Sequence, residues 1–130
     1  MRVTRFDPDG ELILVPGIVT GPHRTATVPL VVDTGAAVTV ISPAIIDQIG
    51  LGARQGLART TMRSAVAEEA GYLIRVPRFV ALGYALDDFL VHAHDLPEGQ
   101  GIDGLIGLNF LREFDYHVHS RRGEIWLDPV

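Results

Sequence analysis

Apolar segments of strand length, separated by turns that contain Gly or Pro, recur along the whole 130-residue chain. Short apolar runs that are rich in Val, Ile, Leu and Phe and bounded by such turns are typical of β-strands. We therefore expect a mostly β protein with one or two short helices. The predicted strands span residues 2–6, 11–20, 25–33, 57–62, 72–82, 89–93, 114–118 and 124–127.

Two segments carry helix signals. In the first, Ser42 suits the N-cap, Pro43 suits the first helical position and Gly50 suits the left-handed residue that ends a helix. A second, shorter helix is expected to begin near Asn109, which is a fair N-cap, and to continue through Arg112.

Length and composition place the chain among ordinary globular domains. At 130 residues it is long enough to bury a core, and we expect one domain over residues 1–130. The hydrophobic fraction is 47%, which is typical of a soluble protein. The chain has no cysteine, so disulfides, zinc–thiolate sites and thiol catalysis are excluded.

The charge pattern bears on partners and location. The formal net charge is −5 and the arginines are scattered, whereas binding to nucleic acid needs clustered basic residues. No apolar stretch approaches the ~20 residues that span a bilayer, and the N-terminus lacks the apolar run of a secretory signal. We therefore expect no nucleic-acid partner, no membrane association and a cytoplasmic location.

A carboxylate stands at the end of the most apolar predicted strand, where Asp33-Thr34-Gly35-Ala36 follows Leu30-Val31-Val32. Asp-Thr-Gly is also a favourable turn sequence, so the tripeptide alone is compatible with a simple turn. However, a carboxylate that follows three buried aliphatic residues must be compensated by hydrogen bonds or used for function. Asp33 is thus the first candidate for catalysis.

A second element, Leu105-Ile106-Gly107, comes just before the second predicted helix. Alone, it is compatible with any core strand that ends at a helix. The two elements together, in this order and in a mostly β chain, are far more specific than either one.

In the order of these elements, from Glu11 to Leu127, the chain resembles the retropepsin family, which includes the retroviral proteases and their single-domain bacterial relatives. Asp33-Thr34-Gly35-Ala36 followed by Thr39 matches the first family signature, and Leu105-Ile106-Gly107 matches the second. The resemblance implies a retropepsin-like acid protease fold, which is a closed barrel or sandwich of strands with one or two short helices.

The resemblance also implies an aspartic endopeptidase that needs no metal or other cofactor. In this family two carboxylates share one proton, because two like charges a few ångströms apart cannot both ionise. The ionised partner takes a proton from water, and the protonated partner hydrogen-bonds the scissile carbonyl of a peptide or protein substrate. The chain has one Asp-Thr-Gly and no Asp-Ser-Gly. A dyad therefore requires a homodimer in which each chain supplies Asp33.

By resemblance, the catalytic residues are Asp33, Thr34 and Gly35. The Thr34 hydroxyl would bond to the partner's loop, and Gly35 would let the two backbones approach closely. Leu105-Ile106-Gly107 would pack behind this loop. Substrate would contact residues near the dyad and a flap at 63–71, and the residues expected to bind it are Ala36, Ala37, Arg63, Ser64, Ala65, Val66 and Ile106.

Three features depart from the retroviral pattern. Ala37 and Leu108 occupy the positions of an Asp–Arg ion pair, so both partners are replaced by apolar residues. The predicted flap has its glycine, Gly71, at its far end and not at its tip, which indicates a longer, partly helical or differently hinged flap. Near the C-terminus, Pro129 cannot donate to a strand ladder, so the dimer is expected to be built differently or to be weak without ligand.

Two other functions are compatible with these residues. The first is a non-catalytic retropepsin-fold module used for dimerisation or peptide binding, which the unusual flap favours. The second is a self-processing domain that is cut from a longer precursor. The intact Asp33-Thr34-Gly35-Ala36 motif favours the protease.

Two histidine pairs, His92 with His94 and His117 with His119, each place two imidazoles on one face of a strand. Such a pair can hold a metal ion. The alternative is that these histidines simply face solvent, on strands whose residues alternate between the two faces of the sheet. The only candidates for a third ligand that lie nearby in sequence are Asp95 for the first pair and Asp115 for the second. Because so few ligands are available, we expect no metal site.

Overall fold

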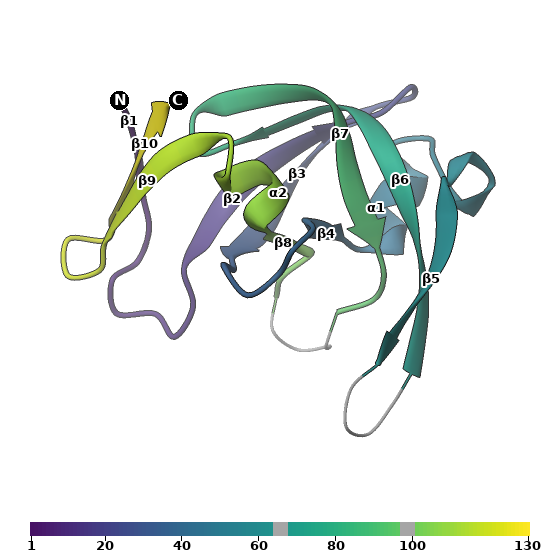
Figure 1. The fold of residues 1–130 in the computed structure, drawn as a ribbon, viewed down its shortest axis with the longest axis horizontal. Helices are drawn as coiled ribbons and strands as arrows, with labels where there is room; N and C mark the ends of the chain where they lie inside the picture. The colour runs from purple at the N-terminus through teal and green to yellow at the C-terminus, as the bar shows by residue number, and fades with distance from the viewer. Residues whose placement is uncertain (64–67, 97–100) are drawn as a thin grey trace.

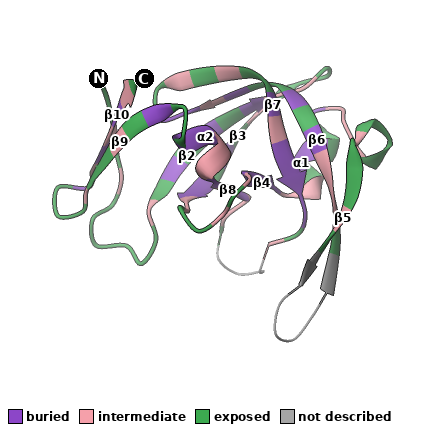
Figure 2. Cartoon of the chain, in the orientation of Figure 1, coloured by how far each residue is buried: buried purple, intermediate pink, exposed green. Residues whose placement is uncertain are grey.

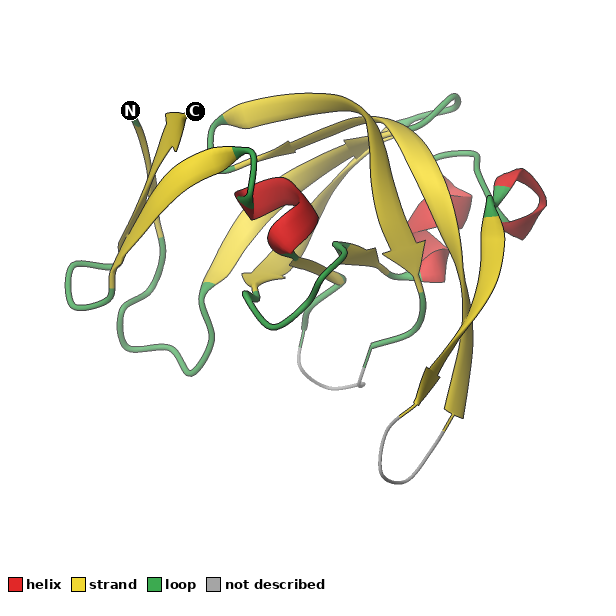
Figure 3. Cartoon of the chain, viewed as in Figure 1, coloured by secondary structure: helices red, strands yellow, loops and turns green. Residues whose placement is uncertain are grey.

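A computed structural model describes residues 1–63, 68–96 and 101–130 of the chain. The described part is mostly β-strand with two short α-helices, as predicted, and it also contains one 3₁₀ turn (Figure 3). Within it, no helix has the length and apolar character needed to cross a membrane. The elements are β1 (Arg2–Arg5), β2 (Leu14–Thr20), β3 (Thr25–Val32), β4 (Val40–Ile41), α1 (Pro43–Gln48), η1 (Ala53–Gln55), β5 (Ala58–Arg63), β6 (Glu68–Ala81), β7 (Tyr84–Ala93), β8 (Gly104–Ile106), α2 (Leu108–Leu111), β9 (Phe114–His119) and β10 (Glu124–Pro129).

Six of the strands form a closed barrel in the order β2-β3-β8-β4-β7-β6, and pairing of β2 with β6 closes the ring (Figure 1). β3 with β8 and β4 with β7 are parallel pairs, and the other pairs are antiparallel. Closure leaves no strand edge in the ring itself. β5 lies outside the ring, where it pairs with β6. The barrel confirms the predicted fold class.

The core fills the barrel and extends under α1 and α2 (Figure 2). Phe79, Phe89 and Phe110 pack at its centre, with ring centroids 4.9–6.0 Å apart. α2 supplies Phe110, and the strands supply the rest of this core through alternation, because residues two apart on a strand share one face. On β2, for example, Val15 and Val19 are buried.

The two ends of the chain meet in a separate three-stranded sheet with the order β1-β10-β9. The last two predicted strands are confirmed, and they form a hairpin in which β10 pairs with β9 from Glu124↔His119 to Pro129↔Phe114. The N-terminal strand β1 pairs with β10 of the same chain. The strands β1 and β10 therefore both pair within one copy of the protein.

Several strand boundaries differ from the prediction. β7 begins at Tyr84, five residues before the predicted start at 89, and joins β6 through a tight turn at Leu82 and Gly83, both with positive φ. The first barrel strand begins at Leu14 and not at residue 11. The two-residue strand β4 was not predicted at all.

The first predicted helix is confirmed in position. Pro43 is its first residue, and Gly50 has a φ of +95°, which is the left-handed region that glycine tolerates. Ser42 is at the N-cap, but its side chain makes no capping hydrogen bond. The second helix begins at Leu108 with Gly107 at the N-cap, so Asn109 lies inside α2 and does not cap it.

Candidate active site

Asp33 directly follows β3, at the end of a barrel strand. Its backbone N–H donates to the carbonyl oxygen of Ile106 over 3.0 Å and so extends the β3–β8 pairing by one residue. The Gly35 N–H donates to Asp33 Oδ1 over 2.8 Å, and the Ala36 N–H donates to the Asp33 carbonyl over 3.2 Å. Asp-Thr-Gly thus does form a turn, and the turn fixes the orientation of the half-buried carboxylate.

The loop after Asp33 lies against the start of α2. The Leu108 N–H donates to the Ala36 carbonyl over 2.8 Å, and the Asn109 N–H donates to the Ala37 carbonyl over 3.1 Å. This approach requires glycine at 107, because a Cβ there would lie 2.8 Å from the Ala36 carbonyl oxygen. Gly107 therefore packs directly against the loop.

Thr39 and Asn109 form a hydrogen-bond network beneath this loop. The fully buried Thr39 hydroxyl donates to Asn109 Oδ1 over 2.9 Å and accepts the Gly107 N–H over 3.1 Å. Asn109 Oδ1 also accepts the Thr39 N–H over 2.8 Å, and Asn109 Nδ2 donates to the Leu90 carbonyl over 2.8 Å. The network ties the loop to α2 and β7.

Replacing Thr39 by Val tests this network. Val matches the shape of Thr but leaves the buried Gly107 N–H without its acceptor, which costs about 1–3 kcal/mol. We expect the free energy of unfolding in urea to fall by that amount. Thr39→Ser keeps the hydroxyl and should stay closer to the wild type. Equal unfolding midpoints for Thr39→Val and the wild type would show that the network does not stabilise the loop.

Asp33 opens onto a cavity of about 400 Å³. The walls are mostly apolar, and the titratable groups among the lining residues are one carboxylate and two imidazoles. A concave, mostly apolar site with a few polar groups is the usual form of a ligand site. The lining residues are Asp33, Gly35, Ala36, Ala37, Val38, Val40, His92, His94 and Leu105.

The sequence profile of the aspartyl protease family matches residues 15–110, which include the whole of this site. The chain belongs to the aspartyl protease family. No curated protein sequence matches it significantly.

Two of the solved structures that share the fold of this aspartyl protease are compared with it. A retropepsin-like aspartic protease from Rickettsia conorii superposes with a TM-score of 0.70 at 17% identity, covering 95% of this chain and 94% of that one. The retroviral protease-like domain of Ddi1 from Leishmania major superposes with a TM-score of 0.66, also at 17% identity, covering 94% and 92%. These likenesses confirm the retropepsin-like fold.

Some of the residues that were predicted to bind substrate line the Asp33 cavity, and others do not. Ala36 and Ala37 line the cavity, but Ile106 is fully buried in the core. Leu105 lines the cavity in its place, because adjacent residues of β8 point to opposite faces. Arg63 ends β5, and the predicted contacts Ser64, Ala65 and Val66 lie outside the described residues.

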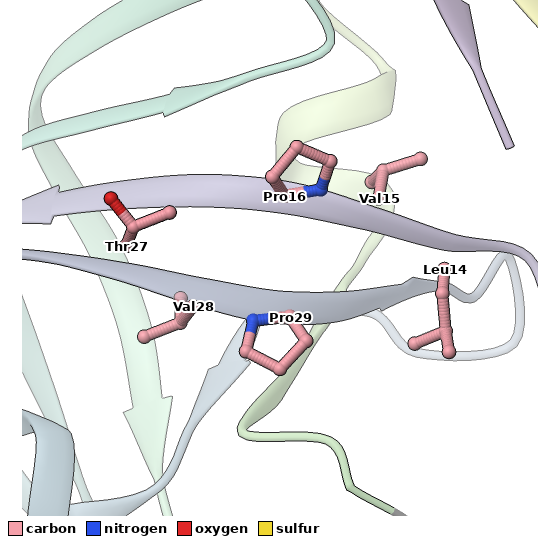
Figure 4. Close-up of a pocket in the computed structure, with 6 residues that line it drawn as sticks. All are labelled: Leu14, Val15, Pro16, Thr27, Val28 and Pro29. Carbon is pink, nitrogen blue, oxygen red and sulfur yellow. The ribbon is translucent and has the colours of Figure 1, made fainter.

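A second hollow, of about 280 Å³, lies on β2 and β3 (Figure 4). It is lined by Leu14, Val15, Pro16, Thr27, Val28 and Pro29. None of these six side chains is titratable, so this hollow offers no group for acid–base chemistry. The cavity at Asp33 is the better candidate for the reaction site of the protease.

His92 and His94 are buried beside Asp33, with 9% and 8% of their surface exposed, so the solvent-facing interpretation fails for this pair. Their ring centroids lie 4.9 Å apart, and His94 Nδ1 hydrogen-bonds the Asp95 carbonyl over 2.8 Å. His117 is exposed, and His119 packs on Trp126 with a centroid distance of 4.0 Å. Within residues 1–63, 68–96 and 101–130, no three His, Asp or Glu side chains gather as metal ligands would.

Burial, and secondarily the neighbouring His94, lower the pKa of His92. The unfolded chain therefore takes up a proton at a higher pH than the folded protein does. We expect the free energy of unfolding to decrease as the pH falls below about 6.5, the ordinary pKa of histidine. Urea unfolding between about pH 8 and pH 5 should show a smaller decrease for His92→Gln than for the wild type.

His117→Gln, which replaces an exposed histidine on β9, is the matched control and should keep the wild-type dependence on pH. Equal pH dependences for His92→Gln and the wild type would contradict the predicted role of His92.

Proposed function

We propose that this aspartyl protease is a homodimeric endopeptidase that hydrolyses peptide bonds with a water activated between two Asp33 carboxylates, one from each chain. The observation that carries the proposal is the placement of Asp33. Its carboxylate is held in a fixed orientation at the edge of a mostly apolar cavity. It is also the one carboxylate among the residues that line this cavity. A second copy supplies the carboxylate that the chemistry requires.

The proposed mechanism follows from two like charges at short distance. The two Asp33 carboxyls hold one proton between them and titrate as a pair. The ionised one takes a proton from the bound water, whose oxygen attacks the scissile carbonyl carbon, while the protonated one hydrogen-bonds the carbonyl oxygen. The C–N bond of the tetrahedral intermediate then breaks as the carboxyl that took the water's proton passes it to the departing amine nitrogen, and the other carboxylate takes back a hydroxyl proton, which leaves the carboxyl product and restores the dyad. Because the Gly35 N–H engages Oδ1, we assign the contact with water to Oδ2.

The neighbouring residues receive supporting roles in this proposal. Thr34 is exposed next to Asp33, and we assign its hydroxyl to a bond with the partner's loop. Ala36, Ala37 and Leu105 form the wall against which an extended peptide lies. We take residues 1–130 as one catalytic domain.

The proposed dimer does not interleave its chain ends. β1 already pairs with β10 of the same chain, and β10 pairs with β9. Exchanging these strands between copies would break a complete three-stranded sheet. We therefore propose that the dimer contact centres on the Asp33 loops.

Cleavage of a peptide library, with the products identified by mass spectrometry, tests this function. At mildly acidic pH the wild-type protein should cut a subset of peptides at bonds that share a sequence preference. The alternative, a non-catalytic module, predicts self-association or peptide binding without any cleavage. Absence of cleavage over a wide range of pH and protein concentration would overturn the proposed endopeptidase.

A further inference from the structure

β5 is the outermost strand of the sheet, and among the described residues its ladder runs to β6 alone, from Ala58↔Leu73 to Arg63↔Glu68. The β5–β6 pair extends beyond the barrel on the same side as the segment 33–39 (Figure 1). A strand with one ladder partner has half of its backbone groups free of the sheet. The direction of β5 therefore depends on contacts other than its ladder with β6 as well.

One such contact comes from the barrel. Thr60 Oγ1 of β5 and His92 Nε2 of β7 form a hydrogen bond, although β6 lies between these two strands. Thr60 pairs with Gly71 on β6, and His92 pairs with Leu73, two residues further along the same strand. The imidazole thus crosses β6 at Gly71 to reach β5.

Gly71 makes the crossing possible. A Cβ at this position would lie 3.1 Å from His92 Nε2, 3.0 Å from His94 Cβ and 2.6 Å from the Ala93 carbonyl oxygen. Any side chain at 71 would thus compete with the imidazole for the same space. This accounts for a glycine at the end of the predicted flap segment: it makes room for a side chain that crosses the sheet.

His92 also lines the Asp33 cavity, so a single imidazole contacts both the cavity and the outer strand. We propose that His92 is a positioning residue, whose hydrogen bond to Thr60 sets the direction of β5 and thereby the affinity for an extended peptide substrate. This inference rests on the proposed endopeptidase function. The Asp33 loop is held separately, by Thr39 and Asn109, so the His92–Thr60 bond governs binding more than the chemical step.

The first test compares Thr60→Val with Thr60→Ser. Val keeps the size and the β-branch of Thr but cannot hydrogen-bond His92, whereas Ser retains the hydroxyl. We expect Thr60→Val to raise KM for a cleaved peptide about 5- to 10-fold with kcat changed by less than about 2-fold. Thr60→Ser should remain close to the wild type. Equal KM values for Thr60→Val and Thr60→Ser would overturn the proposal.

The second test needs no catalytic activity. Backbone amide hydrogen exchange over residues 58–63, without substrate, should be faster in Thr60→Val than in the wild type and unchanged in Thr60→Ser. If the wild type cleaves nothing, the endopeptidase proposal fails while this measurement still decides whether the bond positions β5. Unchanged exchange in Thr60→Val would overturn the positioning role even if cleavage occurs.

A double-mutant cycle identifies the partner of Thr60. His92→Phe keeps a planar ring and removes both nitrogens, so it should reproduce the effect of Thr60→Val on exchange. The double variant should then be no worse than either single variant, because both remove the same bond. Additive effects would assign the two residues to separate interactions and contradict the proposal. Should His92→Phe fail to fold, the comparison of Thr60→Val with Thr60→Ser remains decisive.

Discussion

Replacing Asp33 by Asn is expected to lower kcat/KM for peptide cleavage by at least ~10³-fold and to leave the fold intact. Asn has nearly the same shape as Asp, and its side-chain oxygen can still accept the Gly35 N–H. However, it can neither carry the negative charge that activates water nor share the proton of the dyad. Since both chains of the proposed dimer carry the substitution, both proposed acid–base groups are lost together.

The matched control is Asp115→Asn. Asp115 is exposed on β9 in the terminal sheet, so this variant makes the same change in charge without touching the cavity. It should retain wild-type cleavage of the peptide found in the library. Cleavage by Asp33→Asn at the wild-type rate would show that another group, or another protein in the preparation, does the chemistry.

The barrel was largely predictable because most of its strands carry local signals. β3 and β10 combine apolar runs with flanking turn residues, and the predicted spans agree with the structure to within about two residues. β7 was truncated in the prediction because Asp87 and Asp88 interrupt its apolar pattern. Both are exposed positions of a strand whose later residues are mostly buried, so the apolar pattern marks only the later half of β7.

β4 could not be predicted from local sequence. It has only two residues, Val40 and Ile41, and it is a strand because it pairs with His92 and Ala93 on one side and with Leu105 and Gly104 on the other. Two residues show no periodicity, and these partners lie more than 50 positions away in sequence. Such a strand exists only through its long-range pairing.

The candidate site shows the same division between local and long-range information. The Asp33 turn was visible in the sequence, since a turn tripeptide follows a buried strand. Asn109 was predicted as a helix cap, but its carboxamide binds Thr39, 70 positions earlier in the chain. The hydrogen bond of His92 could not be predicted either, because it depends on Gly71 and Thr60 in two other strands.

The central claim is that one active site needs Asp33 from two chains, and mixing subunits tests it directly. Wild-type protein at a fixed concentration is equilibrated with increasing amounts of the Asp33→Asn chain, and the rate of peptide cleavage is measured. The wild-type concentration is chosen so that its specific activity no longer rises with concentration, which ensures that nearly all chains are dimeric. An inert protein added in the same amounts controls for crowding.

We predict that mixed dimers, with one Asp and one Asn, are inactive. Random exchange of subunits then lowers the activity to about one half at an equal amount of Asp33→Asn chain, and to about one tenth at a tenfold excess. An activity that stays constant through the titration, while an affinity-tagged Asp33→Asn chain co-purifies with untagged wild-type chain and so shows that mixed dimers form, would contradict the shared active site.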